Sequence, residues 1–234
     1  SPTKAVEPPN GILSLAKAEV KVYGNIRLDA SYQAEGGSAS RLYNQINTVP
    51  LKGDKERSDE FKSTLSATRI GLDFKSPVLD QTVSGKLEMD FLGGAGLDNL
   101  RIRHAYLTLN NWLFGQTTSN FLAGHAPEMI DFATNLGGGT TRIPQVRYSY
   151  NLAPATKIFV AAEEGNSSGT AIKYSLPVLT AKVVQGYAEG RGSASGRVMI
   201  ENYKSDSADD NQTGWGVAAG TDFKVTDDLK LFAD

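Results

Sequence analysis

Charged side chains recur along this sequence at alternate positions of short segments, so arginines and carboxylates share one face of each segment. A guanidinium group stays charged and binds carboxylates through paired hydrogen bonds, so such a face could bind anionic solutes. The alternative is that the arginines only form ion pairs with neighbouring acidic residues. The candidate solute-binding residues, on this face or in the loop beside it, are Arg27, Arg69, Lys86, Glu88, Asp90, Arg101, Arg103, Glu128, Asp131, Arg142 and Arg147.

Catalytic and metal chemistry find little support in the residue types present. The chain has no Cys and only two His, which excludes thiol nucleophiles, disulfides and Cys-based metal centres. No G-x-S-x-G motif occurs, and a Ser-His-Asp arrangement would have to be assembled around His104 or His125. We expect His125 to be a loop residue. His104 follows Arg103 directly, so in an alternating segment its side chain would point to the opposite face, and we expect it on the outer wall. The acidic residues between Asp206 and Asp210 lack the spacing of a calcium site. We therefore expect no enzyme activity, no metal and no cofactor.

Composition excludes several broad classes. The 234 residues carry a formal net charge of -2, which argues against a general nucleic-acid binder. With 40% hydrophobic residues, 24 Gly, nine Tyr, nine Phe and two Trp, the chain is too apolar to be disordered. No run of 18 apolar residues occurs, so a transmembrane helix is not available. A membrane location is then open only to a β-barrel.

The elements that position the charged residues are predicted to be strands, because polar and apolar residues alternate with period two. The segment 83–91 has the cleanest alternation, whereas 100–109 loses it at Leu107 and Leu109. We expect about eleven strands and no long helix. The predicted strands are residues 20–32, 68–75, 83–91, 100–109, 112–119, 145–150, 157–163, 172–176, 179–187, 214–223 and 229–234.

The lengths of the predicted connections alternate between short and long. Three are very long: residues 33–63, 121–143 and 189–212. Short turns at one end and long loops at the other are typical of an outer-membrane barrel, whereas a soluble sandwich has no reason to sort its loops. Aromatic residues near strand ends on the apolar parity would form interfacial girdles, although they could also be core residues of a soluble barrel. They are Tyr32, Phe74, Phe91, Trp112, Tyr148, Trp215 and Phe223.

The long connection 121–143 has the composition of a loop that folds into a pore. Pro127 can start a helical turn, and the three glycines 137–139 allow the chain to fold back sharply. A plain extracellular loop is the alternative. We expect Arg69 halfway along its strand and Arg101, Arg103 and Arg147 in the upper halves of theirs, so that all four converge at the height of this loop.

Six segments together resemble the trimeric porins of the Gram-negative outer membrane, and most closely the DcaP-like porins. They cover about the first two thirds of the chain, and the remainder fits by strand pattern only. The segments are VKVYGNIRLDASY (20–32), TRIGLDF (68–74), GKLEMDFLG (85–93), LRIRHAYLTL (100–109), LFGQTTSNF (113–121) and RIPQVRYSY (142–150).

The resemblance implies an all-β, transmembrane antiparallel β-barrel of the 16-stranded porin type, with about eleven strands in this chain. Residues 1–19 would be the trailing end of a periplasmic arm, and 20–234 the barrel without its C-terminal strands, with 121–143 as the pore-constricting loop. The implied function is a diffusion channel in the cell outer membrane for small hydrophilic solutes, preferring anions such as dicarboxylates. The alternative is a barrel that serves as an adhesin or structural anchor. Expected partners are small anionic solutes, outer-membrane lipid, lipopolysaccharide and two further copies of the chain in a homotrimer, and no nucleic acid.

Overall fold

The computed structural model describes residues 18–42, 48–55, 57–94, 98–125, 129–131, 134–135, 140–167, 171–206 and 210–234. Most of these residues lie in one antiparallel sheet, as the alternation predicts. No helix in the described parts of the chain is long and apolar enough to cross a membrane.

Eleven strands follow one another along the main path of the sheet, each hydrogen-bonded to the next. Because every neighbour is the next main strand in the sequence, the chain meanders without crossovers. In order, the strands are β1 (Glu19–Asn25), β4 (Arg69–Val78), β5 (Gln81–Asp90), β6 (Arg101–Leu109), β7 (Trp112–Thr118), β10 (Arg142–Ala153), β11 (Thr156–Glu163), β13 (Val178–Tyr187), β14 (Gly192–Ser205), β15 (Asp210–Lys224) and β16 (Lys230–Ala233).

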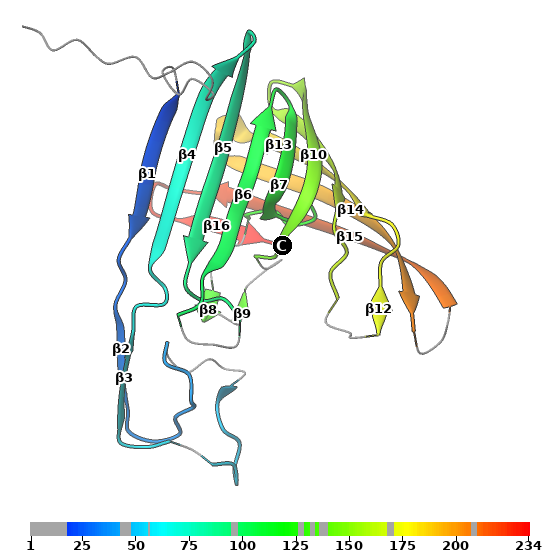
Figure 1. Ribbon diagram of the computed structural model, residues 1–234. Helices are drawn as coiled ribbons and strands as arrows, with labels where there is room; N and C mark the ends of the chain where they lie inside the picture. The colour runs from blue at the N-terminus through cyan, green and yellow to red at the C-terminus, as the bar shows by residue number, and fades with distance from the viewer. Residues whose placement is uncertain are drawn as a thin grey trace, which may run out of the picture.

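Short strands outside this path lie at one end of the sheet. The strands β2 (Asp29–Gln33) and β3 (Glu60–Thr64) form one hairpin, and β8 (Met129–Asp131) and β9 (Thr134–Asn135) form another. The two-residue strand β12 (Ile172–Lys173) pairs with the end of β14. Figure 1 shows that all of these lie at the same end, below the curved wall, and that the sheet curls so that β13 to β16 lie behind the first strands. The opposite end has tight turns, among them 79–80 and 110–111.

The prediction of about eleven strands agrees with the eleven strands of the main path. The agreement hides two errors, one strand missed and one strand wrongly predicted, which leave the total unchanged. The predicted loop 189–212 is wrong, because residues 192–205 form the 14-residue strand β14. The predicted strand 172–176 is also wrong as a wall strand, because only β12 forms there. The first predicted strand, 20–32, divides after Asn25, and its second half leaves the main sheet as β2.

The sheet is polar on its covered face and apolar on its open face, the reverse of a soluble protein. Val22 on β1 and Val217 on β15 are 71% and 67% exposed, whereas Thr180 on β13 and Arg197 on β14 are each 3% exposed. Burying a charge is costly unless it is paired or near water, whereas apolar side chains are stable against lipid. The exposed apolar face is therefore the lipid-facing candidate, and the covered face is the lining of an interior.

A β-bulge in β6 explains why alternation fails there. Glu88 on β5 is opposite His104, and the next residue, Met89, is opposite Ile102, so that Arg103 is the extra residue. A bulge shifts the residues beyond it to the other face. As a result Leu107 is exposed on the apolar face and His104 lies on the polar face. The expected outer-wall position of His104 is wrong for this reason.

The two edges of the described sheet are β1 and β16, which do not pair with each other. Each has a strand partner on one side only within the described residues. Closure into a barrel and a count of sixteen strands remain predictions.

Candidate pore lining

Two acidic residues of β5 hold the arginines of β6 against the polar face. We call Arg69, Glu88, Asp90, Arg101 and Arg103 the acid–arginine cluster. The Arg101 Nε atom donates to Asp90 Oδ1 at 2.8 Å, and a second guanidinium nitrogen contacts the other oxygen of that carboxylate. Arg103 Nε donates to Glu88 Oε2 at 2.8 Å, while Arg69 Nε lies 4.0 Å from the same oxygen. The side chain of Asp90 is almost completely buried by these contacts.

The first strand completes this cluster. Tyr23 on β1 donates its hydroxyl to Glu88 Oε1 at 2.9 Å and accepts a hydrogen bond from Lys86 at 3.0 Å. Lys86 also lies 2.7 Å from Asp73 on β4. Charge-assisted hydrogen bonds of this kind orient long side chains in one direction. Arg101 and Arg103 thus form ion pairs of the kind that the alternative names, with Asp90 and Glu88.

A second group of cations, which the sequence did not single out apart from Arg147, surrounds one aromatic ring. We call Arg147, Lys157, Phe159 and Lys182 the Phe159 cluster. Arg147 Cζ, Lys157 Nζ and Lys182 Nζ lie 5.7, 5.1 and 4.9 Å from the centroid of the Phe159 ring. The three cations come from the neighbouring strands β10, β11 and β13. None of the ion pairs among the described residues includes them.

The sequence could have placed this cluster only with the correct pairing of strands. Phe159 is opposite Ser149 on β10 and Lys182 on β13. Lys182 is in turn opposite Arg197 on β14, which forms a buried ion pair with Asp234. Since Arg197 lies in a segment predicted as loop, no alternation argument could assign it to the lining.

The chain after β7 crosses the polar face of the strands β11, β13, β14 and β15. We call Ser119–His125 the loop limb. Asn120 is fully buried: its backbone N–H donates to Glu163 on β11 at 2.8 Å and its amide nitrogen to Thr180 on β13 at 3.1 Å. Lys182 Nζ donates to the Leu122 carbonyl at 3.1 Å.

The loop limb ends in a histidine that is bound at both ring nitrogens. His125 Nδ1 lies 2.8 Å from Asp222 Oδ2 on β15, and Nε2 lies 2.9 Å from Ser195 Oγ on β14. The side chain is buried, so the expectation of a loop residue is correct for its place in the chain but incomplete for its contacts. A carboxylate can only accept, so Nδ1–H donates to Asp222, and in the neutral imidazole Nε2 then accepts from the Ser195 hydroxyl.

The remaining predicted residues lie at the loop end or outside the described residues. Arg27 is exposed in the link between β1 and β2 and pairs with Asp29 at 2.8 Å, so its expected wall position is wrong. Arg69 begins β4, at its loop end and not halfway along it. Arg142 begins β10, opposite Thr118. Glu128 lies outside the described residues, and of Asp131 only the backbone is described, as the last residue of β8.

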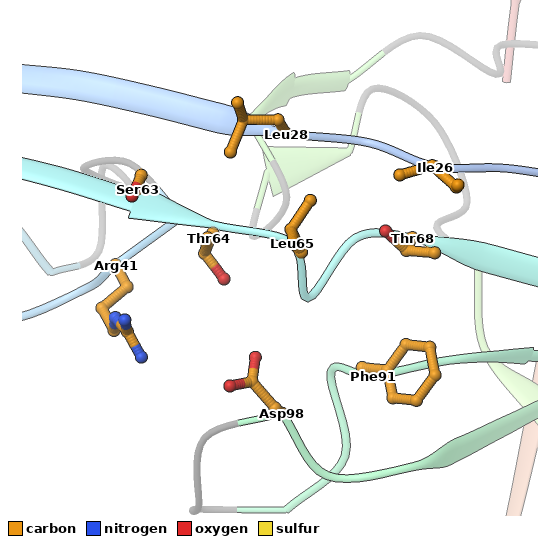
Figure 2. A pocket seen from close by; sticks show the side chains of 9 residues that line it. All are labelled: Ile26, Leu28, Arg41, Ser63, Thr64, Leu65, Thr68, Phe91 and Asp98. Carbon is orange, nitrogen blue, oxygen red and sulfur yellow. The ribbon is translucent and has the colours of Figure 1, made fainter.

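A hollow of about 610 Å³ opens at the loop end, beside the segments that carry Arg27, Arg69 and Asp90, but none of the predicted solute-binding residues lines it. Figure 2 shows Ile26 and Leu28 on one side of it, with Phe91 and Asp98 opposite. Its lining mixes apolar side chains with Arg41, Asp98 and hydroxyl groups, and it contains neither of the two clusters. The described residues also hold no group of three or more His, Asp or Glu side chains that could bind a metal ion.

Comparisons with known proteins agree with this architecture. The family described as DcaP outer membrane protein matches residues 4–233. The outer membrane channel DcaP of Acinetobacter baumannii is 57% identical in sequence, with a TM-score of 0.81. The match covers 95% of this chain and 64% of that channel, so the chain spans 64% of the length of the solved relative.

More distant matches are weak. OmpT, an outer membrane protein of Vibrio cholerae, is 12% identical in its trimer form, with a TM-score of 0.41, covering 92% of this chain and 76% of that one. Its loop L8 deletion mutant is 14% identical with a TM-score of 0.39, covering 92% and 80%. Scores at this level carry no conclusion. The comparison with curated proteins found no match.

Proposed function

The chain belongs to the DcaP outer membrane protein family, and on that premise we propose that it forms part of the wall of a diffusion channel, or porin, for small hydrophilic solutes. It lies in the outer membrane of a Gram-negative bacterium. The observation that carries the proposal is the inverted sheet, whose charged residues line the covered face while Val22 and Val217 are exposed on the other. Such an arrangement needs water on the concave side and lipid on the convex side.

The proposed solutes are small anions, dicarboxylates among them. The support is the Phe159 cluster, in which three cations without an ion-pair partner among the described residues face the interior together. Low-dielectric walls focus the field of several like charges, so anions are enriched there in spite of the net charge of -2. The acid–arginine cluster contributes less, because Glu88 and Asp90 balance most of its charge.

The rest of the architecture follows the family. We propose a closed barrel of sixteen strands in which β1 and β16 pair with further strands, because an open sheet edge is not stable in lipid. Residues 121–143 would be the pore-constricting loop, and the burial of Asn120 on the polar face supports this for the loop limb. Residues 1–19 would be the trailing end of a periplasmic arm. We also propose a homotrimer in contact with lipid and lipopolysaccharide.

Planar-bilayer recordings of the purified protein test this function. We expect a steady conductance and, across a salt gradient, a reversal potential that shows anion preference at low salt. The preference should fade as the Debye length shrinks with added salt. Absence of conductance would favour the adhesin or structural anchor, whereas cation preference would refute only the anion part. Native mass spectrometry of detergent-extracted protein that found only monomers would refute the trimer.

A further inference from the structure

The loop limb has a root and a tip that are held by different strands. At the root, Asn120 is bound by Glu163 and Thr180 on β11 and β13. At the tip, His125 reaches β14 and β15, whose residues Ser195 and Asp222 follow it by 70 and 97 positions in the sequence. Between these points only the Lys182 contact to Leu122 holds the limb among the hydrogen bonds described. The two His125 bonds therefore decide whether the tip stays on the wall.

The wall is shaped to receive this histidine. Gly220 on β15 lies beneath the imidazole, and a Cβ atom at that position would lie 2.7 Å from His125 Cδ2. At Gly216, four residues earlier on the same strand, a Cβ atom would lie 3.4 Å from Phe121 Cζ. Residues 216 and 220 face the interior because they are opposite Met199 and Ser195 on β14. Two glycines on one strand thus allow the limb to lie flush against it.

The Ser195, His125 and Asp222 side chains have the same order of hydrogen bonds as a hydrolytic triad, with the hydroxyl donating to Nε2 and Nδ1–H donating to the carboxylate. A nucleophilic serine also needs hydrogen-bond donors for the oxyanion. Ser195 lies in the middle of β14, between β13 and β15, so the backbone amides around it belong to the strand ladders. The contacts hold the limb in place and provide no site for acyl transfer.

We propose that His125 is a positioning residue, a latch that fastens the loop limb to β14 and β15 and so keeps the limb against the wall, at the edge of the solute path. Without the latch, the tip leaves the wall while the root stays bound, and the tip then extends further into the solute path. The structural part of this inference is independent of transport, whereas its effect on current rests on the proposed channel function.

Hydrogen–deuterium exchange of the folded protein in outer membranes tests the latch directly. Ser195→Ala removes the hydroxyl that binds Nε2. Gly220→Ala displaces the imidazole and also crowds Asp234, whose Oδ1 would lie 2.9 Å from the added Cβ atom. Neither variant changes the limb's own sequence. We expect the amides of residues 122–125 to exchange roughly tenfold faster in both variants. The loss of about one net hydrogen bond raises the population of the detached limb by about that factor. The Asn120 amide, which Glu163 holds, should not change.

Matched controls separate the latch from general damage to the sheet. Ser193→Ala removes the same group from the same strand two residues away, and Gly196→Ala adds a methyl group where no atom lies within 4 Å. Both should leave the exchange of the limb unchanged. The latch is refuted if limb exchange stays at the unmodified level in Ser195→Ala and Gly220→Ala, or if Ser193→Ala accelerates it equally.

Single-channel recordings of His125→Ala test the consequence for transport. We expect transient closures roughly tenfold more often than in the unmodified protein, with the same fully open conductance. Unchanged closure rates together with accelerated exchange would refute the transport consequence. If the unmodified protein carries no current, the channel proposal fails, and the exchange experiment still decides the latch.

Discussion

The ring of Tyr23 on β1 covers Gly71, its cross-strand partner on β4, so closely that a Cβ atom on Gly71 would lie 2.1 Å from Tyr23 Cζ. The glycine gives the ring space to lie along the sheet and reach Glu88 with its hydroxyl at 2.9 Å. Phe74 and Gly85 repeat the arrangement between β4 and β5, with 2.3 Å from the corresponding Cβ position to Phe74 Cζ. An aromatic ring over a cross-strand glycine protects the backbone of a curved sheet.

Gly71→Ala should therefore destabilise the protein by about 1 to 3 kcal/mol, because the added methyl group displaces the Tyr23 ring and breaks its bond to Glu88. The temperature at which the folded form is lost on semi-native electrophoresis measures this. Gly196→Ala, at an open position, is the control and should have little effect. Equal losses in both variants would contradict the role of the ring.

An arginine on the apolar face should be far more costly than one on the polar face. Val160 on β11 is exposed on the lipid-facing side, whereas Ser149, beside it on β10, faces the interior. We expect Val160→Arg to lower the free energy of unfolding by about 2 to 4 kcal/mol, since a cation in the bilayer is poorly solvated. Ser149→Arg should change it much less. Denaturant unfolding in lipid vesicles measures both, and equal defects would contradict the assignment of the faces.

Asp90 and Arg101 should be energetically coupled. Asp90→Asn leaves the Arg101 guanidinium without its carboxylate, and we expect a loss of about 1 to 3 kcal/mol, the range for hydrogen bonds to charged groups. Adding Arg101→Gln to that variant should cost little more. A double-mutant cycle in the unfolding free energy gives the coupling. Additive effects would show that the ion pair does not stabilise the fold.

The two clusters should differ in their effect on selectivity. Lys182→Gln removes a cation that forms no ion pair among the described residues, so we expect the anion-to-cation permeability ratio to fall roughly two- to threefold, as for a change of about one kT in the local potential. Arg101→Gln removes a paired cation and should have a smaller effect. Reversal potentials at low salt measure the ratio. A larger effect of Arg101→Gln would mean that the acid–arginine cluster sets the selectivity.

The double variant Arg101→Glu, Arg103→Glu is a stronger perturbation, because it places four carboxylates where Glu88 and Asp90 now bind arginines. We expect it to reverse or abolish anion preference in the same measurement. It should also destabilise the protein, since like charges at this separation repel.

Local pattern determined much of this protein. Period-two alternation is a property of neighbouring residues, and it identified most of the strands, the polar face and the exposed apolar face without knowledge of any contact. Alternation failed where one extra residue in a strand shifts the following residues to the other face. The bulge at Arg103 moved His104 to the interior and Leu107 to the outside, and the glycine-rich, polar start of β14 read as loop although it forms the strand that carries Ser195 and Arg197.

Contacts between distant segments were decided only by the tertiary structure. Lys157, Phe159 and Lys182 meet because of strand register, which depends on where each turn falls. His125 meets Ser195 and Asp222 because the sheet curls (Figure 1), so that the chain after β7 reaches β14 and β15. That curvature accumulates from the small twist of each strand pair over the whole sheet. No short stretch of sequence encodes it, which is why two histidines without a motif gave no indication of their partners.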